Sequence, residues 1–161
     1  MAGSHLSQWR WSALRPPAHL HLVGVAGVGM SALAQVLLAQ GFKVTGSDRH
    51  LDAGQSLPVL HKLRRAGVTL LPQNGSAIHP TTSAVVVSTA IEPANPDLAA
   101  AHSSGRPVIH RATMLAHLSL TATTLAVAGT AGKTTVTGMI GWALEQAGMD
   151  PTVVNGGAVL N

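Results

Sequence analysis

The 161-residue sequence predicts an α/β fold: a parallel β-sheet with helices on both faces, followed by the first strand, phosphate loop and helix of a second α/β unit. Short apolar runs alternate with runs of helix formers, and the links between them are short. That alternation is typical of βαβ units and therefore of a parallel sheet. Aromatic residues make up only 2% of the chain, so alanine, valine and leucine must fill the core, which suits a sheet covered by helices.

The ends of the first elements are marked by glycine and proline. Residues 19–25 alternate and become β-branched, which predicts a strand, and Gly41 closes a predicted helix at 30–40. A strand at 42–46 leads into a polar loop at 49–54. The helix predicted at 55–66 has Pro58 near its first turn and Gly67 behind it, and a short strand follows at 68–71.

The remaining elements of the first unit have equally clear signals. Residues 84–88 form a continuous apolar run, as expected for a strand buried on both faces. Asn95 is a predicted helix N-cap with Pro96 in the first helical position, and this helix extends to about residue 104. A strand at 107–110 and a helix at 111–118 complete the unit.

A second unit begins at residue 124, with a strand at 124–128, a turn at 129–132, a helix at 133–147 and a strand at 152–154. We therefore divide the chain into an N-terminal extension at 1–17 whose start resembles a tag, a domain at 18–120, and the truncated start of another domain at 121–161. The helix has one apolar face, made by Val136, Met139, Ile140, Ala143, Leu144 and Ala147.

This second unit is too small to bury much apolar surface by itself. We expect residues 124–161 to form a homodimer through this segment, or to fold back on the first domain, with local disorder as the alternative.

Composition excludes several classes of protein. The net charge is +4, but only 10% of residues are charged, and basic residues do not form runs, which favours small anionic ligands over nucleic acid. Scarce aromatic residues argue against single-stranded nucleic-acid platforms. There is no cysteine, and the nine histidines show no metal-ligand spacing. No apolar run approaches the roughly 18 residues of a membrane span, and no signal peptide is visible, so a cytoplasmic protein is predicted.

The first candidate site is the glycine-rich turn at residues 24–32. Glycines let the backbone approach a phosphate closely, and the following helix presents its N–H groups to the anion. Two registers fit the dinucleotide pattern, 24/26/29 and 27/29/32, each with alanine in one glycine position. Asp48 follows at the end of the next strand, where an acid can accept from ribose hydroxyls. A dinucleotide such as NAD, another nucleotide, or a turn that only packs helix on strand all fit this pattern.

The second candidate site is the turn at residues 128–135. Its Gly-Lys-Thr ending is that of a P-loop, in which amides hold phosphates, lysine reaches the terminal phosphates and a hydroxyl binds Mg²⁺. Val127 stands where the strict pattern has its first glycine, so this is the shorter Gly-x-x-Gly-Lys-Thr-Thr form. A dehydrogenase has no use for this second turn, whereas a ligase with two nucleotide substrates uses both.

The combined motifs resemble the Mur ligases, and most of all their alanine-adding members. The matching segments occur in the family's order: residues 21–31 (HLVGVAGVGMS), 44–48 (VTGSD), 85–91 (VVVSTAI), 95–97 (NPD), 110–115 (HRATML) and 127–135 (VAGTAGKTT). The resemblance covers residues 19–161. It implies a Rossmann-like UDP-sugar-binding domain at 18–120 and the start of the P-loop ATP-binding domain at 121–161.

The resemblance also implies roles for individual residues. The UDP diphosphate would be held by Ala26, Gly27, Val28, Gly29, Met30 and Ser31, the uridine part would meet Asp48, and the neighbouring strand end would contribute Ser88, Thr89, Ala90 and Ile91. ATP would be held by Gly129, Thr130, Ala131, Gly132, Lys133, Thr134 and Thr135. Lys133 would be the catalytic residue that binds the β- and γ-phosphates, and Thr134 would bind Mg²⁺. His110 and Arg111 are candidates for a sugar or phosphate contact.

The implied activity is that of an ATP-dependent ligase of peptidoglycan precursor synthesis, which joins L-alanine to UDP-N-acetylmuramate through an acyl phosphate. Position 131 is commonly His or Asn in this family, and here it is alanine. Since the chain stops about a third of the way through such an enzyme, we expect it to bind the UDP-sugar but to be inactive as a ligase. The alternatives are an NAD-binding module and a nucleotide-sensing module without ligase activity.

Overall fold

The computed structural model describes residues 14–155, and its centre is a five-stranded sheet in the order β3-β2-β1-β4-β5. Every strand pair is parallel, which confirms the predicted α/β class. The predicted extension at 1–17 lies almost wholly outside the described residues. The strands are β1 (His19–Val23), β2 (Lys43–Ser47), β3 (Thr69–Leu70), β4 (Ala84–Val87) and β5 (Val108–His110).

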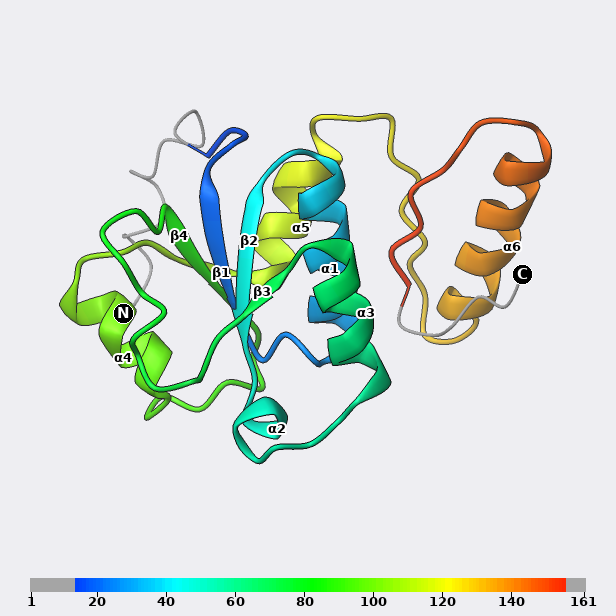
Figure 1. Ribbon diagram of the computed structural model, residues 1–161. Coiled ribbons are helices and arrows are strands. Elements are labelled where there is room, and N and C mark those ends of the chain that lie inside the picture. Colours follow the sequence, from blue (N-terminus) through cyan, green and yellow to red (C-terminus); the bar gives the residue numbers. More distant parts are fainter. Residues whose placement is uncertain (1–13, 156–161) are drawn as a thin grey trace.

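Helices cover both faces of this sheet (Figure 1). On one face lie α1 (Val28–Ala39), α3 (Pro58–Ala66) and α5 (Arg111–Ser119), and on the other lies α4 (Pro96–Ser103). The short helix α2 (Arg49–Asp52) follows β2 at the carboxyl end of the sheet. The chain thus has the doubly covered parallel sheet that the βαβ pattern predicts.

The two faces of the sheet are packed against their helices by different kinds of side chain. On the α1 face, Leu20 and Leu22 of β1 pack with Leu33 and Leu37 of α1 in one large apolar cluster. Full burial of such a leucine contributes about 1.5–3 kcal/mol. Under α4 the buried apolar cluster is small, with Val23, Val85 and Ala101 at its centre. Polar side chains, described below, fill the rest of that face.

Helix ends agree with the capping signals, with small shifts. Asn95 accepts hydrogen bonds from the N–H groups of Asp97 (3.0 Å) and Leu98 (3.2 Å), and Gly67 ends α3 with φ 104°. The prediction that a helix begins at residue 55 was wrong, because α3 begins at Pro58, the position where proline needs no hydrogen-bond acceptor. The loop predicted at 49–54 contains α2, which the side chain of Asp48 caps.

The C-terminal segment forms its helix but not its strands. Helix α6 (Lys133–Gln146) is present, whereas residues 124–128 and 152–154 are not strands. A strand needs a neighbouring backbone to bond with, and no sheet among the described residues pairs with either segment. Instead, the second segment packs along α6, where Asn155 Nδ2 donates to the Thr134 carbonyl (3.0 Å).

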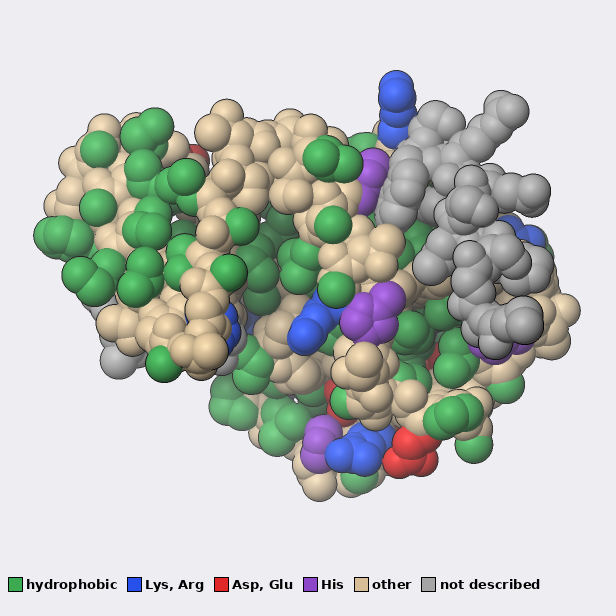
Figure 2. Space-filling view, turned by 180° about the vertical axis from the view of Figure 1, so that it is seen from behind, with side chains coloured by type: hydrophobic (Ala, Val, Ile, Leu, Met, Phe, Trp, Pro, Cys, Tyr) green, Lys and Arg blue, Asp and Glu red, His purple; other side chains and the backbone are tan. Residues whose placement is uncertain are grey.

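Helix α6 lies apart from the sheet and leaves apolar side chains uncovered (Figure 1). Met139 is 66% exposed, Trp142 59% and Val136 44%. Hydrophobic side chains are visible over this lobe in the view from behind (Figure 2). Of the predicted apolar face, Val136, Met139, Ala143 and Ala147 are exposed, whereas Ile140 and Leu144 are partly buried.

Candidate functional site

A cavity of about 600 Å³ lies beyond the carboxyl ends of the strands. Strands β1, β2 and β3 follow one another to one side of the sheet, whereas β4 and β5 lie on the other side of β1. Ligands of open parallel sheets bind in the crevice at such a reversal. The cavity is lined by Gly24, Ala26, Gly27, Val28, Gly29, Met30, Asp48, Arg49, His50, Leu57, Gln73, Ser88, Ala90, Ile91, Glu92, Ala94, Asn95, Pro96 and Arg111.

The predicted glycine turn forms one wall. Gly24 has φ 74°, and its N–H and that of Val25 both donate to the Ser47 carbonyl (2.8 and 3.0 Å), which fastens the turn to β2. Gly27 is the N-cap of α1. The N–H groups of Val28 and Gly29 have no acceptor among the described residues. The first turn of α1 therefore presents free N–H donors and the positive end of the helix dipole to the cavity.

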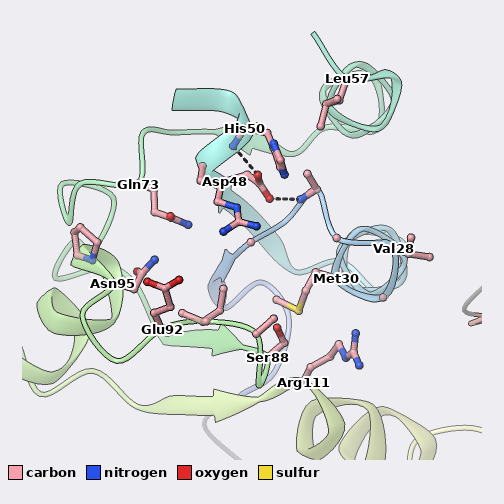
Figure 3. Close-up of a pocket in the computed structure, with 18 of the residues that line it drawn as sticks. Val28, Met30, Asp48, His50, Leu57, Gln73, Ser88, Glu92, Asn95 and Arg111 are labelled. Carbon is pink, nitrogen blue, oxygen red and sulfur yellow. Dashed lines mark hydrogen bonds between the residues drawn. The ribbon is translucent and has the colours of Figure 1, made fainter. Parts of the chain in front are cut away.

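Arg111 adds a cation to the same wall. Its guanidinium lies so close to Gly29 that a Cβ on this glycine would overlap it. Figure 3 shows Arg111 at the start of α5, beside the N-terminus of α1. His110, by contrast, does not line the cavity, and its Nδ1 accepts from the Ala112 N–H (3.2 Å) as the cap of α5. Free amides and a guanidinium at one place are a suitable site for a phosphate group.

Asp48 is buried and organises the turn. One carboxylate oxygen accepts from the Ala26 N–H (2.9 Å) and the other from the His50 N–H (2.9 Å). These two bonds, drawn in Figure 3, join the glycine turn to α2. Each oxygen retains a lone pair, so a ligand hydroxyl could still donate to this side chain.

The segment after β4 forms the next part of the lining. Ser88, Ala90 and Ile91 line the cavity, and the Ile91 side chain lies where a Cβ on Gly24 would be only 2.9 Å away. Two predicted site residues do not line the cavity. Ser31 is buried and its hydroxyl donates to the Val28 carbonyl (2.9 Å), and Thr89 is exposed.

Several lining residues were not predicted from the sequence. Gln73, Glu92 and Asn95 form the wall that faces Asp48 (Figure 3), and Arg49 and His50 lie beside it. Asn95 was recognised only as a helix cap. The available signal was positional: these residues follow β2, β3 and β4, and the carboxyl ends of parallel strands meet at one edge of the sheet.

The predicted ATP loop is formed at the other end of the described chain. Gly129 and Gly132 have φ 152° and 76°, and Gly132 caps α6. Lys133 Nζ donates to the carbonyls of Gly129 (2.6 Å) and Thr130 (3.4 Å). None of residues 129–135 lines the cavity, so the structure keeps the two predicted sites separate.

None of the described helices is long and apolar enough to cross a membrane. Within residues 14–155, no three His, Asp or Glu side chains are grouped as a metal site would require.

The doubly covered parallel sheet, with a glycine turn and free amides at its reversal point, defines an α/β domain of the kind that binds phosphorylated ligands. A family model, "Mur ligase family, catalytic domain", matches residues 19–123. The chain belongs to the Mur ligase family, which confirms the resemblance seen in its motifs.

Relatives and solved structures agree with this membership. The chain is 41% identical over 140 residues to the UDP-N-acetylmuramate–L-alanine ligase of Jannaschia sp. (strain CCS1), and 42% identical to that of Maricaulis maris (strain MCS10). These matches cover 87% of the chain and 28% and 29% of the relatives. The chain thus spans less than a third of their length.

Two solved structures share the fold. A murein peptide ligase from Psychrobacter arcticus 273-4 superposes with a TM-score of 0.72 at 32% identity, over 81% of this chain and 27% of that one. The UDP-N-acetylmuramate-alanine ligase from Thermotoga maritima superposes with a TM-score of 0.70 at 26% identity, over 80% and 29% of the two chains.

Proposed function

We propose that this chain binds UDP-N-acetylmuramate in the cavity beside α1. The observation that carries this proposal is the free N–H groups of Val28 and Gly29 next to the Arg111 guanidinium, which together suit a diphosphate. The cavity volume of about 600 Å³ is within the range of small-ligand sites. The name of the 41%-identical relatives supplies the sugar nucleotide.

We assign the ligand's parts to three segments of the wall. The turn at residues 26–31 and Arg111 hold the diphosphate, with Ser31 acting through its bond to the turn. Asp48 holds the turn and accepts from the ribose of the uridine part. Residues 88–91 cover the nucleotide from the end of β4, where Thr89 supports its neighbours without lining the cavity.

We extend the proposal to the longer protein that the relatives represent. Residues 18–120 would be its UDP-sugar-binding domain, and residues 121–161 would begin its ATP-binding domain. Residues 129–135 would hold ATP, with Lys133 on the β- and γ-phosphates and the Thr134 hydroxyl on Mg²⁺. The positive φ of Gly129 and Gly132 supports a backbone cradle there. Ala131 offers no side chain to the phosphates.

The proposed reaction is the ligation of L-alanine to UDP-N-acetylmuramate. ATP would phosphorylate the sugar's carboxylate, and the amine of alanine would displace phosphate from the acyl phosphate. The contribution of this chain would be positioning and charge neutralisation. Because both proposed nucleotides are cytoplasmic metabolites, we propose a cytoplasmic location. We also propose that the exposed face of α6 supports a homodimer of this chain.

Thermal unfolding with and without ligand tests the binding proposal. At 100 times its dissociation constant, UDP-N-acetylmuramate should add about 2.7 kcal/mol to the free energy of unfolding, which raises the melting temperature. NAD at the same concentration should have no effect. A shift with NAD and none with the UDP-sugar would refute the proposal in favour of a dinucleotide-binding module.

A further inference from the structure

Three polar side chains are buried together beneath α4. His21, Ser47 and Asp97 are each 0% exposed. The Ser47 hydroxyl donates to Asp97 Oδ2 (2.5 Å), and His21 Nε2 lies 3.3 Å from the same oxygen and 3.2 Å from Ser47 Oγ. Burial of such groups is costly unless each finds a partner. Here each of the three side chains has hydrogen-bond partners, and these bonds offset the cost of burying the groups.

The hydrogen bonds form a directed chain. Ser47 gives its proton to Asp97, so the Ser47 oxygen accepts from the His21 Nε2–H. On the other side of the ring, His21 Nδ1 meets Thr45 Oγ1 (2.8 Å), which also meets His19 Nε2 (2.9 Å). A neutral His21 protonated on Nε2 satisfies every contact when His19 donates to Thr45 and Thr45 donates to His21. The cluster is therefore complete without a ligand.

Although the cluster contains Ser, His and Asp, it is not a nucleophilic site. In a catalytic triad the histidine accepts the serine proton and the serine faces the substrate. Here the serine proton goes to the carboxylate, and Ser47 has no exposed surface. Burial opposes ionisation of Asp97, but hydrogen bonds from His21, Ser47 and Gly75 outweigh it and lower the pKa of this carboxyl.

The cluster is joined to three parts of the cavity wall. Ser47 directly precedes Asp48, and Asp97 directly follows Pro96. The second oxygen of Asp97 accepts from the Gly75 N–H (2.7 Å), two residues beyond Gln73. Asp48, Gln73 and Pro96 all line the cavity. One buried carboxylate thus fastens the loop at Gly75 and the start of α4 to the end of β2.

We propose that the His21–Ser47–Asp97 cluster is a positioning device that sets the distance between the Asp48 side of the cavity and the Gln73–Asn95 side. It touches no ligand. Because the cluster holds the cavity wall in one conformation, no conformational entropy is lost in ordering that wall when a ligand binds. The cluster therefore raises the affinity by preorganisation. This inference rests on the proposed binding function for the identity of the ligand, but not for the effect on the wall.

The test compares Ser47→Ala and Asp97→Ala with Val85→Ala. Ser47→Ala is the milder change, because His21 remains within reach of Asp97 and the chain should still fold. Val85 is fully buried on the same face of the sheet and pairs with His21 across β1 and β4, but it makes no side-chain hydrogen bond to the cluster and does not line the cavity. Its truncation therefore removes apolar packing beside the cluster without removing a hydrogen bond. Two quantities are measured on folded protein: amide hydrogen exchange at residues 72–76, and the dissociation constant for UDP-N-acetylmuramate.

We expect both cluster variants to exchange faster at Gly75 and its neighbours while the β1 and β4 amides stay protected. Their dissociation constants should rise about tenfold or more, which corresponds to the loss of one strong buried hydrogen bond. Val85→Ala should leave both quantities unchanged. Unchanged exchange at residues 72–76, or equal effects in Val85→Ala, would overturn the inference. Failure of the unaltered chain to bind the UDP-sugar would refute the proposed function, and the exchange measurement would still decide this inference.

Discussion

Gly29 is the residue on which the proposed diphosphate site depends most directly. Its N–H has no acceptor within residues 14–155, and the Arg111 guanidinium lies against this glycine. Only glycine leaves room for both features, because any Cβ would overlap the guanidinium. Since that group is the end of a flexible side chain, a substitution would displace it and leave the fold intact.

We therefore predict that Gly29→Val abolishes the thermal shift caused by UDP-N-acetylmuramate. The added side chain would occupy the anion position and displace Arg111, while the loss of stability should stay within about 1 kcal/mol. Thermal unfolding and calorimetric titration would measure the two effects. Ala39→Val, at the exposed far end of the same helix, is the matched control. Equal affinities in the two variants would contradict the assignment.

The pKa of His19 gives a second residue-scale prediction. Burial first, and then electrostatic interactions with His21, His79 and Lys43, lower its pKa below 6.5. The unfolded chain therefore takes up a proton more readily than the folded chain, and stability falls as pH drops below about 6.5. The pKa of His117, lowered by burial, acts in the same direction.

Urea unfolding at pH 7.5 and pH 5.5 would measure this dependence. We expect His19→Asn to weaken it without removing it, because His117 still contributes. The same pH dependence in the variant and the unaltered chain would show that His19 is not responsible.

At the residue scale, the sequence predicted the wall of the cavity that contains the glycine turn and Asp48, but not the opposite wall that contains Gln73 and Glu92. The glycine turn was recognised because phosphate binding demands a local pattern that is contiguous in sequence. Asp48 was recognised from its place at the end of the next strand, and the Ser88–Ile91 segment through the family resemblance. Gln73 and Glu92 have no such pattern, since they become part of the cavity only when separate strand ends meet. The two amide bonds to Asp48 were also unforeseen, because they depend on the folded path of the turn.

At the scale of elements, the sequence predicted the helix ends correctly where a capping residue or a glycine marks them. Asn95–Pro96 and Gly67 mark helix ends through interactions within a few residues. The predicted strands at 124–128 and 152–154 had suitable residues but were wrong, because a strand is stabilised by its neighbour as much as by its own sequence. Helix α6 forms without such a neighbour.

The uncovered face of α6 leads to a prediction about association. Val136, Met139 and Trp142 are spaced three residues apart on α6 and are all exposed, and large exposed apolar patches are rare on soluble monomers. We expect the chain to be a dimer by light scattering, and a version ending at Thr121 to be a monomer. If both are monomers of equal stability, residues 122–161 contribute no interface and the dimer proposal fails.

At the scale of the whole molecule, the cavity beside α1 and the predicted phosphate loop are separate sites within the described residues. Lys133 donates to the carbonyls of its own loop, and residues 129–135 are exposed. No other described segment encloses that loop as phosphoryl transfer to a carboxylate requires.

We predict that the 161-residue chain does not form ADP from ATP, Mg²⁺, L-alanine and UDP-N-acetylmuramate. A coupled assay for ADP would measure this, with Lys133→Ala as the control for contaminating activity. Alanine-dependent ADP release that disappears in Lys133→Ala would refute the prediction and assign ligase activity to this chain alone.

The strand order has a consequence for how the molecule is made. Of the five strands of this sheet, β1 is synthesised first and occupies the middle, and Leu20 pairs with Ala84, which is synthesised much later. At about 5–20 residues per second, roughly 3–13 seconds separate these two residues during translation. Throughout that interval only the edge of β1 that faces β2 can form its backbone hydrogen bonds. Met114 and Leu118, which complete the main cluster, are later still. We therefore expect the sheet and its main apolar cluster to remain incomplete until α5 has been synthesised, and translational pauses before that point to prolong the exposure of apolar surface to aggregation.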